Sequence, residues 1–325
     1  MSSKLLVNNA IWSALAHLLG RGSLVVAAML LSNKLLSGDF AAYSYFQLTV
    51  SMLATYSALG MGVTASRFFA EVGVVKSECL QPLGALWLLS ILIGLIICGL
   101  ILLIPNEWIS GGLNIPNWLL SLGVFVILLG IVPGGGILGL EQYKAVTFFS
   151  LVSAVILILG VVSLTEESTS YDAILFFILS MAVQSLGNSY IVFKRVGFEK
   201  LYNTRAINKK TIKVILNFAG PMFLASLMAA SGSWLVGRII LSGDSGEYQF
   251  ALYAIGLQWF SLTLFMPGMV SRVVLPRLIR AELSSGSDVK LTKQASLLTV
   301  GAAIFTVLVG ALVSPFLLRF YGDEY

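Results

Sequence analysis

Residues 82–104 read PLGALWLLSILIGLIICGLILLI, an apolar stretch without a charged residue. A helix of roughly 20 residues crosses a hydrocarbon core of about 30 Å. Inside that core only helices and closed barrels satisfy every backbone hydrogen-bonding group, and barrel strands are shorter and alternate in polarity. The stretch therefore predicts a membrane-spanning helix.

Similar stretches recur along the whole chain. Hydrophobic residues make up 58% of the 325 residues and charged residues only 11%, whereas soluble domains carry about 25% charged residues. The expected fold class is an all-α polytopic membrane protein with about nine transmembrane helices, arranged as one six-helix bundle plus half of a second, parallel-repeat bundle. The expected spans are residues 9–31, 40–66, 82–104, 117–140, 145–164, 173–193, 214–241, 249–271 and 295–318.

The net charge of +5 indicates membrane topology and not a nucleic-acid partner, because the basic residues lie in short loops between apolar stretches. With the N-terminus in the cytoplasm, sixteen of the 20 basic residues fall on the inside. Arg21 lies within a span, and the outside loops hold Lys34, Arg238 and Arg319. Cytoplasmic loops of membrane proteins carry such an excess of Lys and Arg. We expect a multi-pass protein of a bacterial inner (plasma) membrane with a cytoplasmic N-terminus.

The longest hydrophilic stretch divides the chain into six expected spans and three. The predicted domains are an N-terminal six-helix bundle, a basic cytoplasmic linker and a partial C-terminal bundle of three helices, at residues 1–193, 194–213 and 214–325.

An internal repeat accompanies this division. An offset of 205 residues aligns Leu36-Ser37-Gly38-Asp39 with Leu241-Ser242-Gly243-Asp244, and Ser66-Arg67 with Ser271-Arg272. Six spans separate the copies, so both run in the same direction, as in transporters with parallel repeats and a substrate path between them. Chance identity is the alternative, but the matches are polar and fall at equivalent membrane boundaries. A repeat of six predicts twelve helices, so we expect the last three to be missing; a native nine-helix protein is the alternative.

Several short motifs carry a family resemblance. They are Asn8-Asn9-Ala10-Ile11-Trp12, the Leu36–Asp39 turn, Leu59-Gly60-Met61-Gly62 with Ser66-Arg67 at the end of the second span, Gly139-Leu140-Glu141 after the fourth, and Phe320-Tyr321-Gly322-Asp323-Glu324-Tyr325 after the ninth. In this order the chain resembles the polysaccharide transporters of the multidrug/oligosaccharidyl-lipid/polysaccharide exporter superfamily, and within it the Wzx-type O-antigen flippases.

The resemblance implies a fold and an activity. Members of the family have two six-helix bundles around a central cavity and move undecaprenyl-diphosphate-linked oligosaccharides across the inner membrane by alternating access. The implied cargo is an O-antigen unit for lipopolysaccharide biosynthesis or a capsule or exopolysaccharide repeat unit. The implied partners are this lipid-linked oligosaccharide, membrane lipids and a polysaccharide polymerase or chain-length regulator. No cofactor is implied.

The first span carries polar residues at four-residue spacing, Asn9, Ser13, His17 and Arg21, which predicts a stripe along one helix face. A charge near a helix centre costs about 2.5–3.5 kcal/mol, so Arg21 is expected to face a partner or a water-filled cavity. The planar guanidinium fork suits a diphosphate. The alternatives are that Arg21 pairs with a neighbouring helix or extends to an interface, and that His17 is a hydrogen-bonded packing residue.

Other polar residues complete the candidate cavity. Gln47, Ser51 and Thr55 share four-residue spacing in the second span, and Gln258 lies in the eighth. Their side chains suit sugar hydroxyls, and hydrogen bonds between helices are the alternative. Arg238 is predicted to be either an outer charge site or an interfacial anchor.

The sequence shows no catalytic or metal-binding pattern within the expected spans, which favours a transporter over an enzyme. A cation-coupled multidrug exporter of the same superfamily is one alternative, but it should carry a carboxylate at mid-membrane depth, and the nine expected spans contain none. A membrane subunit of a polysaccharide-assembly complex that does not itself transport is the other. The cluster Pro133-Gly134-Gly135-Gly136 lacks the Lys-Ser/Thr of a phosphate-binding loop and predicts a hinge or a close-packing site.

Reporter fusions test the predicted topology. A reporter that is active only in the periplasm should be active after Glu107, Thr169 and Gly246, and inactive after Lys144 and Gly286, because the loop charges orient every span. Reversed activity at two or more of these positions would contradict the nine-span arrangement.

Overall fold

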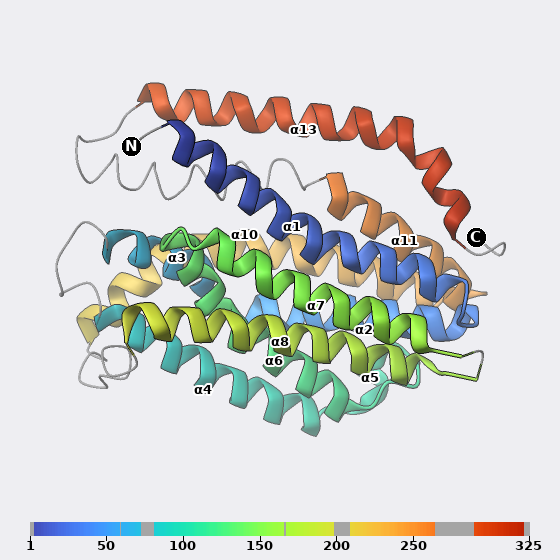
Figure 1. Ribbon diagram of the computed structural model, residues 1–325. Coiled ribbons are helices and arrows are strands. Elements are labelled where there is room, and N and C mark those ends of the chain that lie inside the picture. Colours follow the sequence, from blue (N-terminus) through green and yellow to red (C-terminus); the bar gives the residue numbers. More distant parts are fainter. Residues whose placement is uncertain are drawn as a thin grey trace.

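The computed structural model describes residues 3–58, 60–72, 81–165, 167–197, 209–263 and 289–321, and these residues form helices joined by short connections (Figure 1). The helices are α1 (Ser3–Ser32), α2 (Ser37–Ala58), α3 (Met61–Val72), α4 (Gln81–Leu103), α5 (Asn106–Ser110), α6 (Asn117–Gly139), α7 (Tyr143–Ser163), α8 (Ser170–Val196), α10 (Lys209–Leu241), α11 (Gly246–Thr263) and α13 (Val289–Leu317), followed by a 3-10 turn at Leu318–Phe320.

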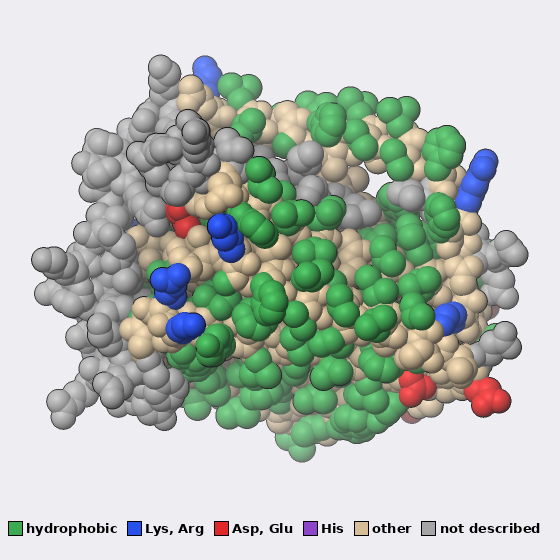
Figure 2. Space-filling view, in the orientation of Figure 1, with side chains coloured by type: hydrophobic (Ala, Val, Ile, Leu, Met, Phe, Trp, Pro, Cys, Tyr) green, Lys and Arg blue, Asp and Glu red, His purple; other side chains and the backbone are tan. Residues whose placement is uncertain are grey.

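Six of the described helices are long and apolar enough to cross a membrane, or seven if the bent pair α2 and α3 counts as one span. The expected number of nine is therefore not confirmed. In α10 the apolar part is the shorter segment Ser226–Leu241, and the expected span 249–271 extends beyond α11 into residues outside the described ranges. Figure 2 shows hydrophobic side chains across the long middle of one face, with charged groups gathered toward its two ends.

The expected span at 40–66 is broken into two helices. The axes of α2 and α3 differ by 55°, and the break contains Gly60 with a φ of 72°. Glycine adopts this left-handed conformation without the strain that a Cβ causes, and it commonly ends helices. The bend directs α3 toward α6 and α4, while α2 continues through the centre of the molecule.

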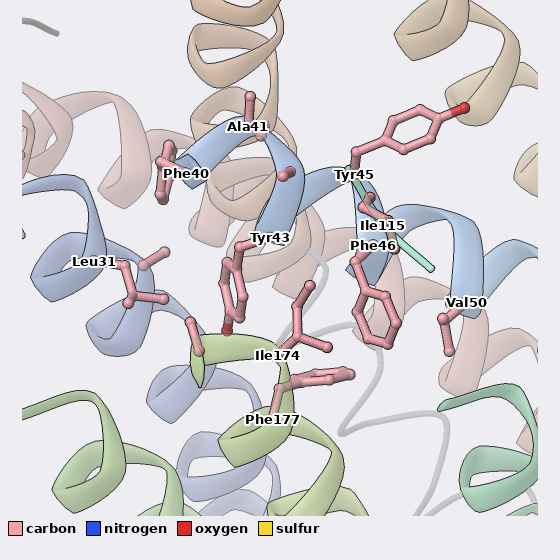
Figure 3. Packing of buried hydrophobic residues seen from close by; sticks show 14 of the residues in the cluster. Leu31, Phe40, Ala41, Tyr43, Tyr45, Phe46, Val50, Ile115, Ile174 and Phe177 are labelled. Carbon is pink, nitrogen blue, oxygen red and sulfur yellow. The ribbon is translucent and has the colours of Figure 1, made fainter. Parts of the chain in front are cut away.

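The bundle formed by α1 to α8 has α6 near its middle, where it packs against α2, α3, α4 and α8, and α7 joins α1 to α8. Figure 3 shows the aromatic contact between α2 and α8, in which the rings of Tyr43 and Phe46 approach the ring of Phe177 edge to face. Ring centroids are 6.4 Å apart for Tyr43 and 6.1 Å apart for Phe46. Such pairs contribute beyond the area that they bury.

The Pro133–Gly136 cluster is a close-packing site between α6 and α3. A Cβ at Gly135 would overlap the backbone oxygen of Gly62, and one at Gly139 would overlap the backbone oxygen of Ser66. Small residues let helices approach closely in lipid, where van der Waals contact replaces the hydrophobic effect as a driving force. The two helices therefore meet backbone to backbone.

Serine hydroxyls join the other helices of this bundle. Ser185 of α8 donates to the carbonyl of Val126 at 2.9 Å, and Ser153 of α7 donates to the carbonyl of Ser180 at 2.8 Å. Ser90 of α4 donates to α6 in the same way. Hydrogen bonds of this kind hold transmembrane helices together.

The connection between α1 and α2 is tied to α7 and α8. Lys34 donates from Nζ to the carbonyls of Val162 and Leu164 at 2.6 and 2.7 Å, and these carbonyls belong to the end of α7. Asp39 Oδ1 accepts the backbone N–H of Ser170 at the start of α8, at 2.9 Å. The carbonyls at the end of α7 and the N–H at the start of α8 have no partner within their own helices, and these two contacts supply one. Asp39 of the repeated motif therefore has a structural role in its first copy.

The helices after the linker cover α2 from the other side. Both α10 and α11 pack on α2, and they run in the same directions as α1 and α2 respectively (Figure 1). The 241–244 turn lies at the same end as the 36–39 turn, where Glu247 approaches Gly38. Superposition of residues 9–193 on 214–318 stays a prediction, as does the linker: α8 runs to Val196 and α10 begins at Lys209, with 198–208 outside the described residues.

A pair of neighbouring glycines tests the α3–α6 contact. Gly135→Ala should lower the thermal unfolding temperature, since overpacking a tight contact costs roughly 1–3 kcal/mol. Gly134→Ala is the matched control, because the nearest atom to a Cβ there is Asn188 Nδ2 at 3.8 Å. Thermal unfolding of both variants in detergent measures the difference, and equal stability of the two would contradict the described contact.

Candidate functional site

The polar series on α1 slants around the helix, so that its residues meet different surroundings. Each four-residue step turns about 40° around a helix of 3.6 residues per turn, so the series sweeps about a third of the circumference. Asn9 Nδ2 donates to Glu141 Oε2 at 3.1 Å in the corner between α6 and α7. Ser13 is only 2% exposed within the bundle. These two residues therefore face the first bundle.

Arg21 lies on a different face of α1. The residues four and seven positions later, Val25 and Ala28, are buried, whereas Arg21 is exposed. Since these positions share a helix face, the face is covered toward the α1–α2 turn and open at Arg21. Arg21 forms no hydrogen bond or ion pair with any residue in the described ranges. His17, one turn before it, is partly buried and has a partner.

On α2, too, the polar side chains become more exposed with distance from the α1–α2 turn. Tyr43 and Ser44 are buried, Gln47 is partly buried and Ser51 is exposed. With a rise of 1.5 Å per residue, Arg21 and Gln47 both lie roughly 15 Å from the α1–α2 turn. Arg21 on α1 and Gln47 on α2 thus lie at similar depth. On both helices, the described side chains become more exposed with distance from this turn.

The hydrogen bonds of these α2 residues are local. Gln47 Nε2 donates to Tyr43 Oη at 2.7 Å, and Thr55 Oγ1 donates to the carbonyl of Ser51 at 2.7 Å. Among the contacts described, neither residue forms a bridge to another helix. Gln47 keeps its side-chain carbonyl as an acceptor and Ser51 its hydroxyl, which suits a polar ligand.

The end of the molecule that holds the α1–α2 turn is closed by contacts between α10 or α11 and the first bundle. The rings of Tyr45 and Phe250 meet with centroids 5.4 Å apart. Trp234 Nε1 donates to Thr49 Oγ1 at 3.2 Å. Near the other end of α2, the hydroxyls of Tyr56 and of Ser231 on α10 also form a hydrogen bond.

Arg238 belongs to this closed end. Its Nη2 donates to the backbone carbonyl of Glu107 at 3.2 Å, and its side chain lies against Gly111. Ser231, Trp234 and Arg238 therefore share a face of α10 that contacts the first bundle. The structure separates Arg238 from Arg21: the former is at the closed end and the latter within α1.

Gln258 on α11 is partly buried, and its Oε1 has no hydrogen-bond partner in the described part of the chain. Buried polar atoms usually have a partner in the protein or an ordered water. The unpaired oxygen is therefore an acceptor for a hydroxyl, an amide or water.

Sequence reasoning missed the polar contacts that depend on distant residues. Glu141, quoted only as part of a motif, accepts from Asn9 and adopts a positive φ of 54°, which is uncommon for a residue with a side chain. The pair Thr49 and Trp234 is separated by 185 residues. Spacing within one span carries no signal for such contacts.

Known proteins resemble this chain in sequence and in fold. No family model matches the chain. It is 20% identical over 294 residues to the EPS I polysaccharide export inner membrane protein EpsE of Ralstonia solanacearum. The match covers 88% of this chain and 66% of that protein, so the chain spans slightly less than two thirds of its relative.

Solved structures show the same helical arrangement. The MATE multidrug transporter DinF-BH has a TM-score of 0.72 and 14% identity, and the match covers 97% of this chain and 75% of that one. The outward-facing conformation of a multidrug resistance MATE family transporter of the MOP superfamily has a TM-score of 0.71 and 16% identity, with 98% and 74% covered. This chain therefore has the MATE-like fold of MOP-superfamily transporters.

Proposed function

We propose that this chain belongs to a flippase that moves an undecaprenyl-diphosphate-linked oligosaccharide across the bacterial inner membrane by alternating access. The observation that carries the proposal is Arg21, a guanidinium within a membrane-spanning helix that has no partner among the described residues. It lies on a helix face that is buried toward the α1–α2 turn and exposed at Arg21 itself.

An unpaired cation at this depth favours an anionic ligand. A charge within a span is costly unless it is paired or lies in a water-filled cavity. A diphosphate offers oxygens in the geometry that a guanidinium binds through two parallel hydrogen bonds. Gln47, Ser51 and Gln258 supply acceptors and donors for the sugar hydroxyls of the same ligand.

The arrangement of open and closed ends fits a carrier. The ring contact between Tyr45 and Phe250 and the hydrogen bond from Arg238 to the Glu107 carbonyl close the end at the α1–α2 turn, while Arg21 and Ser51 are exposed farther from it. The loop charges assign the N-terminal end to the cytoplasm. In this assignment the conformation accepts cargo from the cytoplasmic side, and separation of α10 and α11 from α2 releases it outside.

The name of the Ralstonia relative, a polysaccharide export inner membrane protein, supports a saccharide cargo. Export of a cationic drug, as the multidrug transporters with the same fold suggest, is the main alternative to a saccharide cargo. A cationic drug calls for a carboxylate within the spans. In the described helices Asp39 binds the start of α8 and Glu141 binds Asn9 at a helix corner, so neither is a free anion at mid-depth, and the anionic cargo is favoured.

Substitution of Arg21 tests the proposal in the host. The full-length gene carrying Arg21→Ala should fail to restore polysaccharide export in a deletion strain, and the lipid-linked saccharide should accumulate on the cytoplasmic face. Arg21→Lys should restore only part of the export, because an ammonium keeps the charge but loses the bidentate fork. Export and accumulation are measured at matched protein abundance in the membrane.

Leu18→Ala is the control for this experiment, since Leu18 lies one turn before Arg21, is 53% exposed and has an apolar side chain without charge or hydrogen-bonding groups. It should export normally. Normal export by an abundant Arg21→Ala variant would remove Arg21 from the mechanism. A deletion strain without any accumulated saccharide would instead favour drug export or a subunit that does not transport.

A further inference from the structure

A groove of about 590 Å³ lies on the outer surface between α7 and α8, outside the contact between α2 and α10. Its lining consists of Gln142, Ala145, Phe148, Phe149, Tyr190, Ile191, Lys194 and Arg195. We call it the α7–α8 groove. Figure 2 shows the face that these helices form: hydrophobic groups cover its middle, and basic groups gather at one end.

The walls of the α7–α8 groove are aromatic and accessible from the surrounding membrane. Phe148 is 59% exposed and Tyr190 is 58% exposed. The floor is formed by Phe149, whose ring fills the space that a side chain at Gly187 would need. Gly187 thus allows Phe149 to pack down against α8, which leaves the groove concave.

The groove is positively charged at the end that lies beside the last turn of α8. Lys194 and Arg195, both exposed, lie in the last turn of α8, and Lys194 Nζ is 5.8 Å from the centroid of the Tyr190 ring. The lining contains no carboxylate. Glu141, next to the lining residue Gln142, already accepts a hydrogen bond from Asn9.

The last turn of a helix and a cytoplasmic loop both favour basic residues for reasons unrelated to a ligand. These reasons do not account for the concave aromatic surface directly beneath the charges. A membrane lipid has a charged phosphate at the interface and acyl chains below it, which match the basic end and the aromatic surface of the groove. Basic pockets between transmembrane helices bind anionic headgroups in this way.

We propose that the α7–α8 groove binds an anionic glycerophospholipid, with its phosphate against Lys194 and Arg195 and an acyl chain along Phe148 and Tyr190. The amide of Gln142 can donate to the same phosphate. This site is independent of the cargo path, since none of its lining residues belongs to α1, α2, α10 or α11.

Lipid binding to the purified full chain tests the proposal. Native mass spectrometry in detergent should detect dioleoyl-phosphatidylglycerol bound at least about tenfold more tightly than dioleoyl-phosphatidylcholine, because each interfacial cation attracts an anionic headgroup. The double variant Lys194→Gln with Arg195→Gln should lose this preference. Phe148→Ala should weaken the binding of both lipids.

The matched control removes two exposed cations elsewhere, with Lys293→Gln and Arg319→Gln, and should keep the preference. Equal binding of the two lipids, or an unchanged preference in the Lys194/Arg195 double variant, would overturn the proposal. It would also be overturned if undecaprenyl diphosphate bound more tightly than phosphatidylglycerol through the same two residues, because the groove would then hold cargo. Arg21→Ala should keep the preference, which separates this test from that of the flippase.

Discussion

The backbone contact between α6 and α3 is the constraint on which the first bundle depends. Helices in lipid associate through close packing and hydrogen bonds, since lipid chains are as apolar as their side chains. Gly135 and Gly139 let α6 reach the backbone of α3. This contact requires α3 to leave the direction of α2, and the bend at Gly60 provides the change. As a result α2 lies on the side of the first bundle that contacts α10 and α11, where the proposed path runs.

Some polar groups hold helices together, and others have no hydrogen-bond partner within the described part of the chain. Serine hydroxyls, Lys34, Asp39 and Glu141 have partners on neighbouring helices. In the described ranges, Arg21 and the side-chain oxygen of Gln258 have none. Because unpaired polar groups in a membrane are costly, these are the two residues that we propose for cargo binding.

Much of the fold follows from the sequence, because a stretch such as 82–104 can only be a helix in lipid. The break in the second span was missed, since apolar residues continue on both sides of Gly60 and a glycine alone does not end a membrane helix. The stripe on α1 slants around the helix, because each step of four residues rotates by about 40°, and its members meet different surroundings. Contacts such as Thr49 with Trp234 depend on how the bundles meet, which local spacing does not encode. The repeat, the linker and the count of nine spans stay predictions.

Arg21 is proposed to recognise a diphosphate within the membrane. The most direct measurement is the affinity of the purified full-length protein for undecaprenyl diphosphate compared with uncharged undecaprenol. We expect a strong preference for the diphosphate, which Arg21→Ala abolishes and which Lys194→Gln with Arg195→Gln leaves intact. Equal affinity for both lipids, or a preference that survives Arg21→Ala, would contradict it.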